Sequence, residues 1–149
     1  MNPLDMLRVV DELIGGAEEA FWRSAISRIY YAAFHVARGL LLSCGFAVPL
    51  DQRAHAYLWR RLSHSGHPDV AAAGATLWRL RRDRNGADYH LDRPVSHDLA
   101  VRDYELALDG IRLLQAAAVD PVVRPRITQT IKTYERDVLL EVTWRPLTP

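Results

Sequence analysis

The segment AEEAFWRSAISRIYYAAFHVARGLLLS, residues 17–43, decides the fold class of this chain of 149 residues. Its apolar residues recur every three or four positions, which is the period of one face of an α-helix. Gly45 follows where a helix stop is expected. The segment therefore predicts one long helix against which other helices pack. The residues of the predicted inward face are Phe21, Ala25, Ile29, Ala32, Val36 and Leu40.

Shorter segments on both sides repeat the same period, so we expect an all-α protein without paired strands. Asn2-Pro3 is a typical helix start, and Ser96 is a typical N-cap. Helices are expected over residues 3–14 and 52–63, from residue 68 through the arginines that follow, and over residues 96–118.

The last part of the chain has a different pattern. Asp120-Pro121 and Pro125 indicate a linker, and a short helix is expected over residues 127–138 before a tail with two prolines. We therefore predict that residues 1–119 form an up-and-down bundle of four to five helices. Residues 120–149 are expected to form an extension, a short helix and an extended tail, that packs on the bundle or on a dimer partner.

Composition narrows the class of protein. Hydrophobic residues make up 49% and charged residues 25% of the chain, as in ordinary globular proteins, and the formal net charge is only +1. Nucleic-acid binding would therefore need a local basic patch. Cys44 is the single cysteine, which excludes an intrachain disulfide and a cysteine zinc ribbon. With no signal peptide and no apolar run long enough to span a bilayer, we expect a cytoplasmic protein.

Residues 80–90, LRRDRNGADYH, concentrate the groups that are capable of chemistry. Guanidinium groups are permanently charged, forked donors that suit phosphate oxygens. An imidazole titrates near neutral pH and can move a proton in either direction. Together they are a minimal set for cleaving a phosphodiester, and we expect neither a metal site nor a cofactor. The residues concerned are Arg79, Arg81, Arg82, Arg84, Asn85, Asp88, Tyr89 and His90.

The spacing of these residues constrains the site. Arg84 and Asp88 are one helical turn apart, so the carboxylate can orient the guanidinium. Arg84 and His90 lie about 120° apart around a straight helix and would converge poorly. Either the helix ends or bends near Gly86, or two chains build the site across a two-fold axis.

The segment RNGADYH, residues 84–90, resembles the signature of HEPN domains, an arginine followed by a polar residue and, a few residues later, a histidine. RSAISRIYYAAFH, residues 23–35, resembles the second helix of a small bacterial branch of this family. Residues 54–58, AHAYL, and the helix from Ser96 fall where the family places its later elements. The resemblance covers roughly residues 3–118.

The resemblance implies an all-α bundle that forms a homodimer with its motifs facing each other, and a metal-independent endoribonuclease activity. On this pattern Arg84 would hold the scissile phosphate, and His90 would be the general acid or base while the ribose 2′-hydroxyl attacks. Asn85 and Asp88 would position these groups, and Tyr89 would stack or donate. Supporting roles are also predicted for Arg81 and Tyr31.

The resemblance also implies partners. Bacterial proteins of this kind often act as toxins beside a minimal nucleotidyltransferase antitoxin. Some of these antitoxins modify a tyrosine near the motif, and Tyr89 is placed for that. A non-catalytic module that binds a nucleotide, RNA or a partner protein is the alternative. The Arg84–His90 pair favours the enzyme, because binding alone needs an arginine but no titratable partner.

Overall fold

The computed structural model describes residues 1–148, and helices account for most of them. The prediction of an all-α bundle is confirmed. Within the described part of the chain the only extended pairing is an isolated bridge between Phe46 and Trp144. The elements are α1 (Asp5–Ile14), α2 (Glu19–Cys44), α3 (Arg53–Ser63), α4 (Pro68–Tyr89), α5 (His97–Val119), α6 (Val123–Tyr134) and the π-helical turn η1 (Glu135–Leu139).

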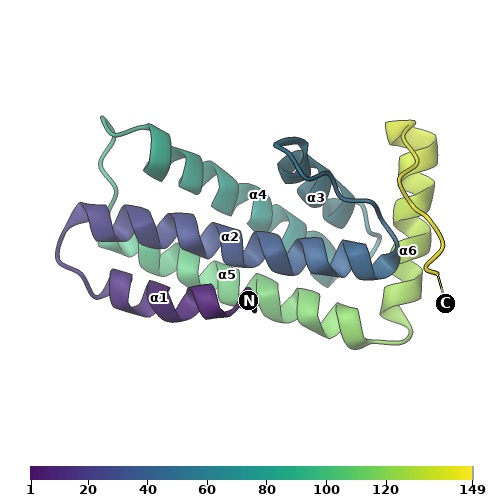
Figure 1. Ribbon diagram of the computed structural model, residues 1–149, viewed down its shortest axis with the longest axis horizontal. Helices are drawn as coiled ribbons and strands as arrows, with labels where there is room; N and C mark the ends of the chain where they lie inside the picture. Colours follow the sequence, from purple (N-terminus) through teal and green to yellow (C-terminus); the bar gives the residue numbers. More distant parts are fainter. Residues whose placement is uncertain (149) are drawn as a thin grey trace.

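The long helix α2 is the centre of the molecule. Figure 1 shows α1, α2, α4 and α5 lying side by side along the long axis, with α3 beside α4 and α6 across one end. Ala25, Ile29 and Ala32 of the predicted inward face are fully buried. Phe21 was expected in the same face but is 43% exposed, because its ring lies over Gly16 beyond the end of the core.

The end of α2 and the start of α5 lie where the local sequence signals predict them. Gly45 adopts φ 103°, the left-handed conformation that glycine tolerates, and Phe46 N donates to Leu41 O at 3.0 Å to close α2. Ser96 Oγ accepts a hydrogen bond from Leu99 N at 3.1 Å at the start of α5. These caps fix where the chain turns between antiparallel helices.

The terminal segment packs onto the bundle. Ile127 and Ile131 of α6 are fully buried in the same core as α2 and α4. The expected linker is shorter than predicted: α6 begins at Val123 and includes Pro125, because a proline in the first turn has no intrahelical N–H partner to lose. Three apolar residues of η1 and the following chain are exposed: Val138, Leu140 and Val142.

Candidate functional site

Arg84 and Asp88 form an ion pair on the last turns of α4, as their spacing predicts. Arg84 Nε lies 2.9 Å from Asp88 Oδ2, although the N–H is not aligned for a hydrogen bond. Ser27 Oγ, from α2, donates to the same carboxylate oxygen at 3.1 Å. The carboxylate therefore links α4 to α2 and holds one edge of the guanidinium in place.

Aromatic rings fix the rest of the Arg84 guanidinium. Its central carbon lies 5.1 Å from the centre of the Tyr31 ring and 5.2 Å from that of Tyr89, within the range of a cation–π interaction. Its Nη atoms donate to Asn85 Oδ1 at 3.2 Å and to the Tyr89 hydroxyl at 3.4 Å. The side chain keeps 13% of its surface exposed, so it is oriented but still reachable. Four predicted site residues, Tyr31, Asn85, Asp88 and Tyr89, thus meet around the Arg84 cation.

An open groove of about 350 Å³ adjoins this cluster. One stripe of α2 forms most of it, since positions spaced by three or four residues share a helix face. Asp88 closes the α4 side. We call this the motif groove; its lining residues are Met6, Ser24, Ser27, Arg28, Tyr31, His35 and Asp88.

Two neutral histidines lie close to the cluster. Burial, and then the charge of Arg38, lowers the pKa of His35 below its ordinary value of 6.5. Burial, followed by Arg81 and Arg84, lowers the pKa of His55 in the same way. His55 Nδ1 contacts the Tyr30 hydroxyl in the core. Near pH 7 either imidazole is a proton acceptor, and His35 is the one that lines the groove.

His90 lies apart from Arg84 within the chain. The helix stays continuous through Gly86 and ends at Tyr89, so the expected bend near Gly86 is absent. His90 is the exposed C-cap residue, and its side chain makes no contact with Arg84 in residues 1–148. The single chain therefore does not bring the two side chains together.

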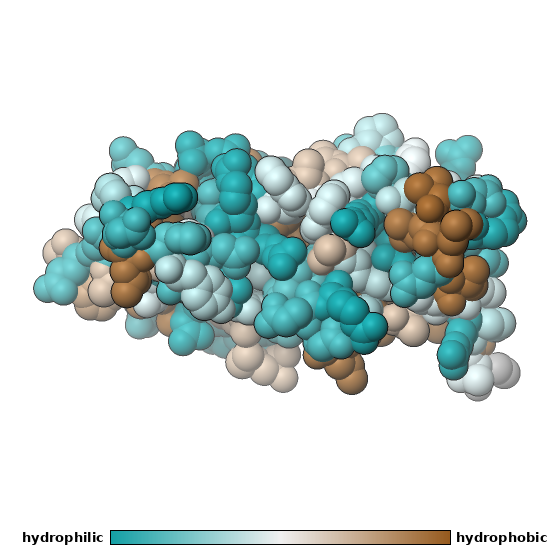
Figure 2. Space-filling model, turned by 90° about the horizontal axis from the view of Figure 1, so that it is seen from above, coloured by the Kyte–Doolittle hydropathy of each residue, from teal (hydrophilic) through white to brown (hydrophobic). Residues whose placement is uncertain are grey.

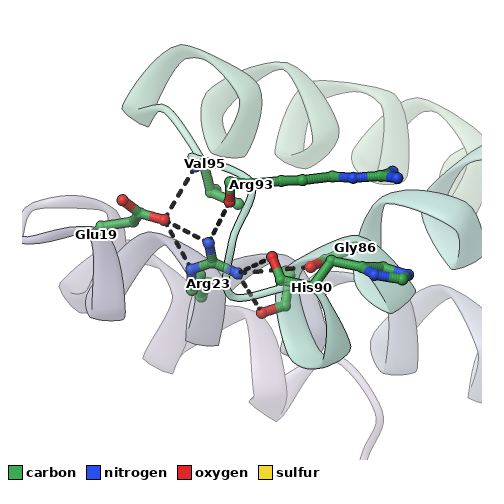
Figure 3. A network of polar contacts seen from close by, with 7 residues as sticks. Glu19, Arg23, Gly86, His90, Arg93 and Val95 are labelled. Carbon is green, nitrogen blue, oxygen red and sulfur yellow. Dashed lines mark hydrogen bonds and ion pairs between the residues drawn. The ribbon is translucent and has the colours of Figure 1, made fainter.

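Arg23 of α2 holds the end of α4 and the turn after it. Figure 3 shows its guanidinium between Glu19 and a ring of backbone carbonyls. Its Nη1 donates to Ala87 O at 2.8 Å and to His90 O at 3.4 Å, and its Nη2 contacts Arg93 O. Glu19 Oε1 accepts from Arg23 Nε at 2.8 Å. Carbonyls at a helix end lack intrahelical donors, and Arg23 supplies them.

Sequence reasoning missed several of these contributors. Ser27, Arg28 and His35 are not among the predicted site residues, although their spacing along α2 places them with Tyr31 on one stripe. The carbonyl-binding role of Arg23 has no local signal, because its acceptors lie more than sixty residues away in the chain.

No family model matches the chain, and neither the curated proteins nor the solved structures contain a match. Among residues 1–148 no helix is long and apolar enough to cross a membrane. No three His, Cys, Asp or Glu side chains of this part cluster as a metal site would require.

Proposed function

We propose that this protein is a metal-independent endoribonuclease of the HEPN type whose site is completed when two copies pair. The observation that carries the proposal is the fixed Arg84 guanidinium. Asp88 and two tyrosine rings orient it beside the open motif groove. A planar donor held in this way suits the oxygens of a phosphodiester.

The chemistry needs one charge-stabilising group and one proton carrier. Arg84 binds a non-bridging phosphate oxygen and stabilises the charge that develops there, a contribution typically worth ~3–4 kcal/mol. His90 takes the proton from the ribose 2′-hydroxyl, whose oxygen attacks phosphorus. The bond from phosphorus to the 5′-oxygen breaks, and that oxygen takes up a proton. The products are a 2′,3′-cyclic phosphate and a 5′-hydroxyl end.

In this proposal, pairing of two chains brings Arg84 and His90 close together. Along α4, Arg84 and His90 are separated by roughly 9 Å of helix rise and about 120° of rotation. A two-fold axis beside the α4 ends would bring Arg84 of one copy to His90 of the other. Tyr89 is 67% exposed on the same surface, which is where a nucleotidyltransferase antitoxin could modify it.

A binding module is the second candidate. The observation that favours it is the distance between Arg84 and His90 in the single chain, together with the Asp88 carboxylate that already balances the Arg84 charge. A module of this kind would grip a nucleotide, RNA or a partner protein without cutting. It needs the arginine and the tyrosines, but no proton carrier.

RNA cleavage in EDTA separates the two candidates. Purified protein should cut single-stranded RNA without divalent ions, and a substrate with 2′-deoxyribose at the cleaved position should resist. Arg84→Ala and His90→Ala should each lower the rate ~10²-fold or more. Arg112→Ala, an exposed arginine on α5, is the matched control and should cut normally. RNA binding without cleavage by the unaltered protein would favour the binding module.

A further inference from the structure

A second open cavity, of about 390 Å³, lies between α3 and α4 and is separate from the motif groove. Its lining residues are Trp59, Ser63, Ala75 and Trp78. Figure 2 looks down on the side of the molecule that carries α3 and α4, and hydrophilic side chains prevail there. Trp78 is nevertheless 47% exposed. Two indole rings beside an open cavity offer a flat apolar ligand a place to stack.

The two helices that form the walls of this cavity, α3 and α4, pack closely together at Gly74. A Cβ on Gly74 of α4 would lie 2.8 Å from Ser63 N and 3.0 Å from Leu62 Cβ of α3, so only glycine permits this close approach. Ser63, which takes part in this contact, and Ala75, which follows Gly74, both line the cavity with small side chains. The two tryptophans therefore lie on helices that pack closely together.

Each tryptophan has an arginine beside it. The guanidinium carbon of Arg60 is 5.5 Å from the centre of the Trp59 ring, and that of Arg82 is 5.6 Å from the Trp78 ring. The Arg82 side chain is 59% exposed, and its nearest carboxylate, Asp83, lies 3.5 Å away. Stacking surfaces with adjacent cations are the combination that binds single-stranded nucleic acid.

The cavity is also connected to the motif by one stripe of α4. Trp78, Arg82, Asn85 and Tyr89 are spaced by four, three and four residues, so they share one face of the helix. The stripe extends over roughly 16 Å of helix rise. Exposed aromatic and basic groups therefore lead from the cavity to the Arg84 cluster.

We propose that the cavity between Trp59 and Trp78 is a substrate subsite that stacks an unpaired RNA base, while Arg60 and Arg82 bind the flanking phosphates. The proposal rests on RNA being the ligand of the motif. It adds a preference for single-stranded over double-stranded RNA, because a paired base cannot enter the cavity. It also places the strand along α4, with the cleaved phosphate at Arg84.

Binding of an uncleavable probe tests the subsite apart from catalysis. The probe is a fluorescein-labelled oligouridylate with 2′-O-methyl groups throughout, and anisotropy reports its Kd. Loss of one base stack should weaken binding of Trp78→Ala about 5- to 150-fold. Arg82→Gln, which leaves both indole rings in place, should weaken binding and reduce its salt dependence. Arg112→Gln is the matched charge control and should bind as the unaltered protein does. The same strand annealed to its complement should bind weakly, with no difference between the variants.

The outcomes distinguish failure of the subsite from failure of the nuclease. Equal Kd values for Trp78→Ala, Arg82→Gln and the unaltered protein, while ribo-oligonucleotides are still cut, would overturn the subsite alone. Tryptophan-dependent binding without any cleavage would support the subsite and contradict the nuclease. A change in self-association of Trp78→Ala by light scattering, with RNA binding unchanged, would show a protein-binding surface instead and overturn the proposal.

Discussion

Two arginine–carboxylate pairs, Arg61–Glu135 and Arg84–Asp88, use the same chemistry in opposite ways. Arg61 and Glu135 are enclosed, with side chains 2% and 0% exposed, and their closest N–O distance is 2.7 Å. Arg84 and Asp88 keep 13% and 28% of their surface. The comparison teaches that ion pairs of the same residue types can differ widely in burial, and that only the Arg84–Asp88 pair remains partly accessible to solvent.

The enclosed pair joins the terminal segment to α3. Glu135 also accepts hydrogen bonds from Thr143 N at 3.0 Å and Thr143 Oγ1 at 2.5 Å, and the Arg61 guanidinium lies 3.4 Å from the centre of the Tyr57 ring. Pockets of about 250 and 200 Å³ adjoin Arg61 and Glu135, but the two side chains themselves are almost wholly enclosed.

Removing the Glu135 side chain should have the largest effect on the unfolding free energy. Glu135→Ala removes the buried partner of Arg61 and leaves it only the exposed Glu141 carboxylate; breaking a buried pair typically costs ~3–5 kcal/mol of unfolding free energy. The melting temperature should fall by roughly 6–20 °C. Glu141→Ala is the matched control, because that carboxylate lies 3.7 Å from Arg61 Nη2 but is 64% exposed; it should cost less than ~1 kcal/mol. Equal melting temperatures for the two variants would contradict the distinction that we draw.

Removing the Arg23 side chain should lower the unfolding free energy by an intermediate amount, because its partners are backbone carbonyls near the protein surface. Arg23→Ala should lower the unfolding free energy by ~1.5–3 kcal/mol, the range for hydrogen bonds to a charged group. Amide exchange should accelerate most over residues 86–95, where its acceptors and the Glu19 contact lie. Arg8→Ala, an arginine of α1 that is 80% exposed, controls for loss of charge. Uniform acceleration along the whole chain would show that Arg23 does not act locally.

A third carboxylate, Asp103, is buried without an arginine pair. Burial, and then the neighbouring Asp83, raises its pKa from 3.8 to about 7, while Arg102 and Arg79 act in the opposite direction. A raised carboxyl pKa means that the folded state holds a proton that the unfolded state releases. The unfolding free energy should therefore fall as the pH rises from about 4 to about 7, by at most ~1.4 kcal/mol per pH unit.

Denaturant titrations across this pH range check the expectation. Asp103→Asn removes the ionisable group and should flatten the dependence of the unfolding free energy on pH. Asp109→Asn, at an exposed residue of the same helix, should leave that dependence unchanged. A profile with the same slope in Asp103→Asn and in the unaltered protein would assign the proton to another group.

The sequence predicts those parts of the structure that depend on neighbouring residues. Helix α2, its stop at Gly45 and the Ser96 cap follow from local periods and backbone preferences. Burial along α5 does not follow residue type: Leu108 is 42% exposed, whereas Asp103 is fully buried. A hydrophobic pattern does not predict a buried carboxyl whose pKa is raised by burial and then by the neighbouring Asp83.

The ion pairs also divide into those that the sequence predicts and those that it does not. The Arg84–Asp88 pair was predictable, because one helical turn brings the two together. The Arg61–Glu135 pair was not, since 74 residues separate its members and neither has a local pattern. Convergence of His90 on Arg84 stays a prediction, because it depends on contacts between copies of the chain.

Mixing two inactive variants tests the two-chain nuclease site most directly. Arg84→Ala and His90→Ala are co-refolded and assayed on RNA beside each variant alone. In a mixed dimer one of the two sites receives Arg84 from one chain and His90 from the other. Random pairing should therefore restore about a quarter of the unaltered rate. A mixture no more active than the separate variants, although mixed dimers are present, would contradict the account.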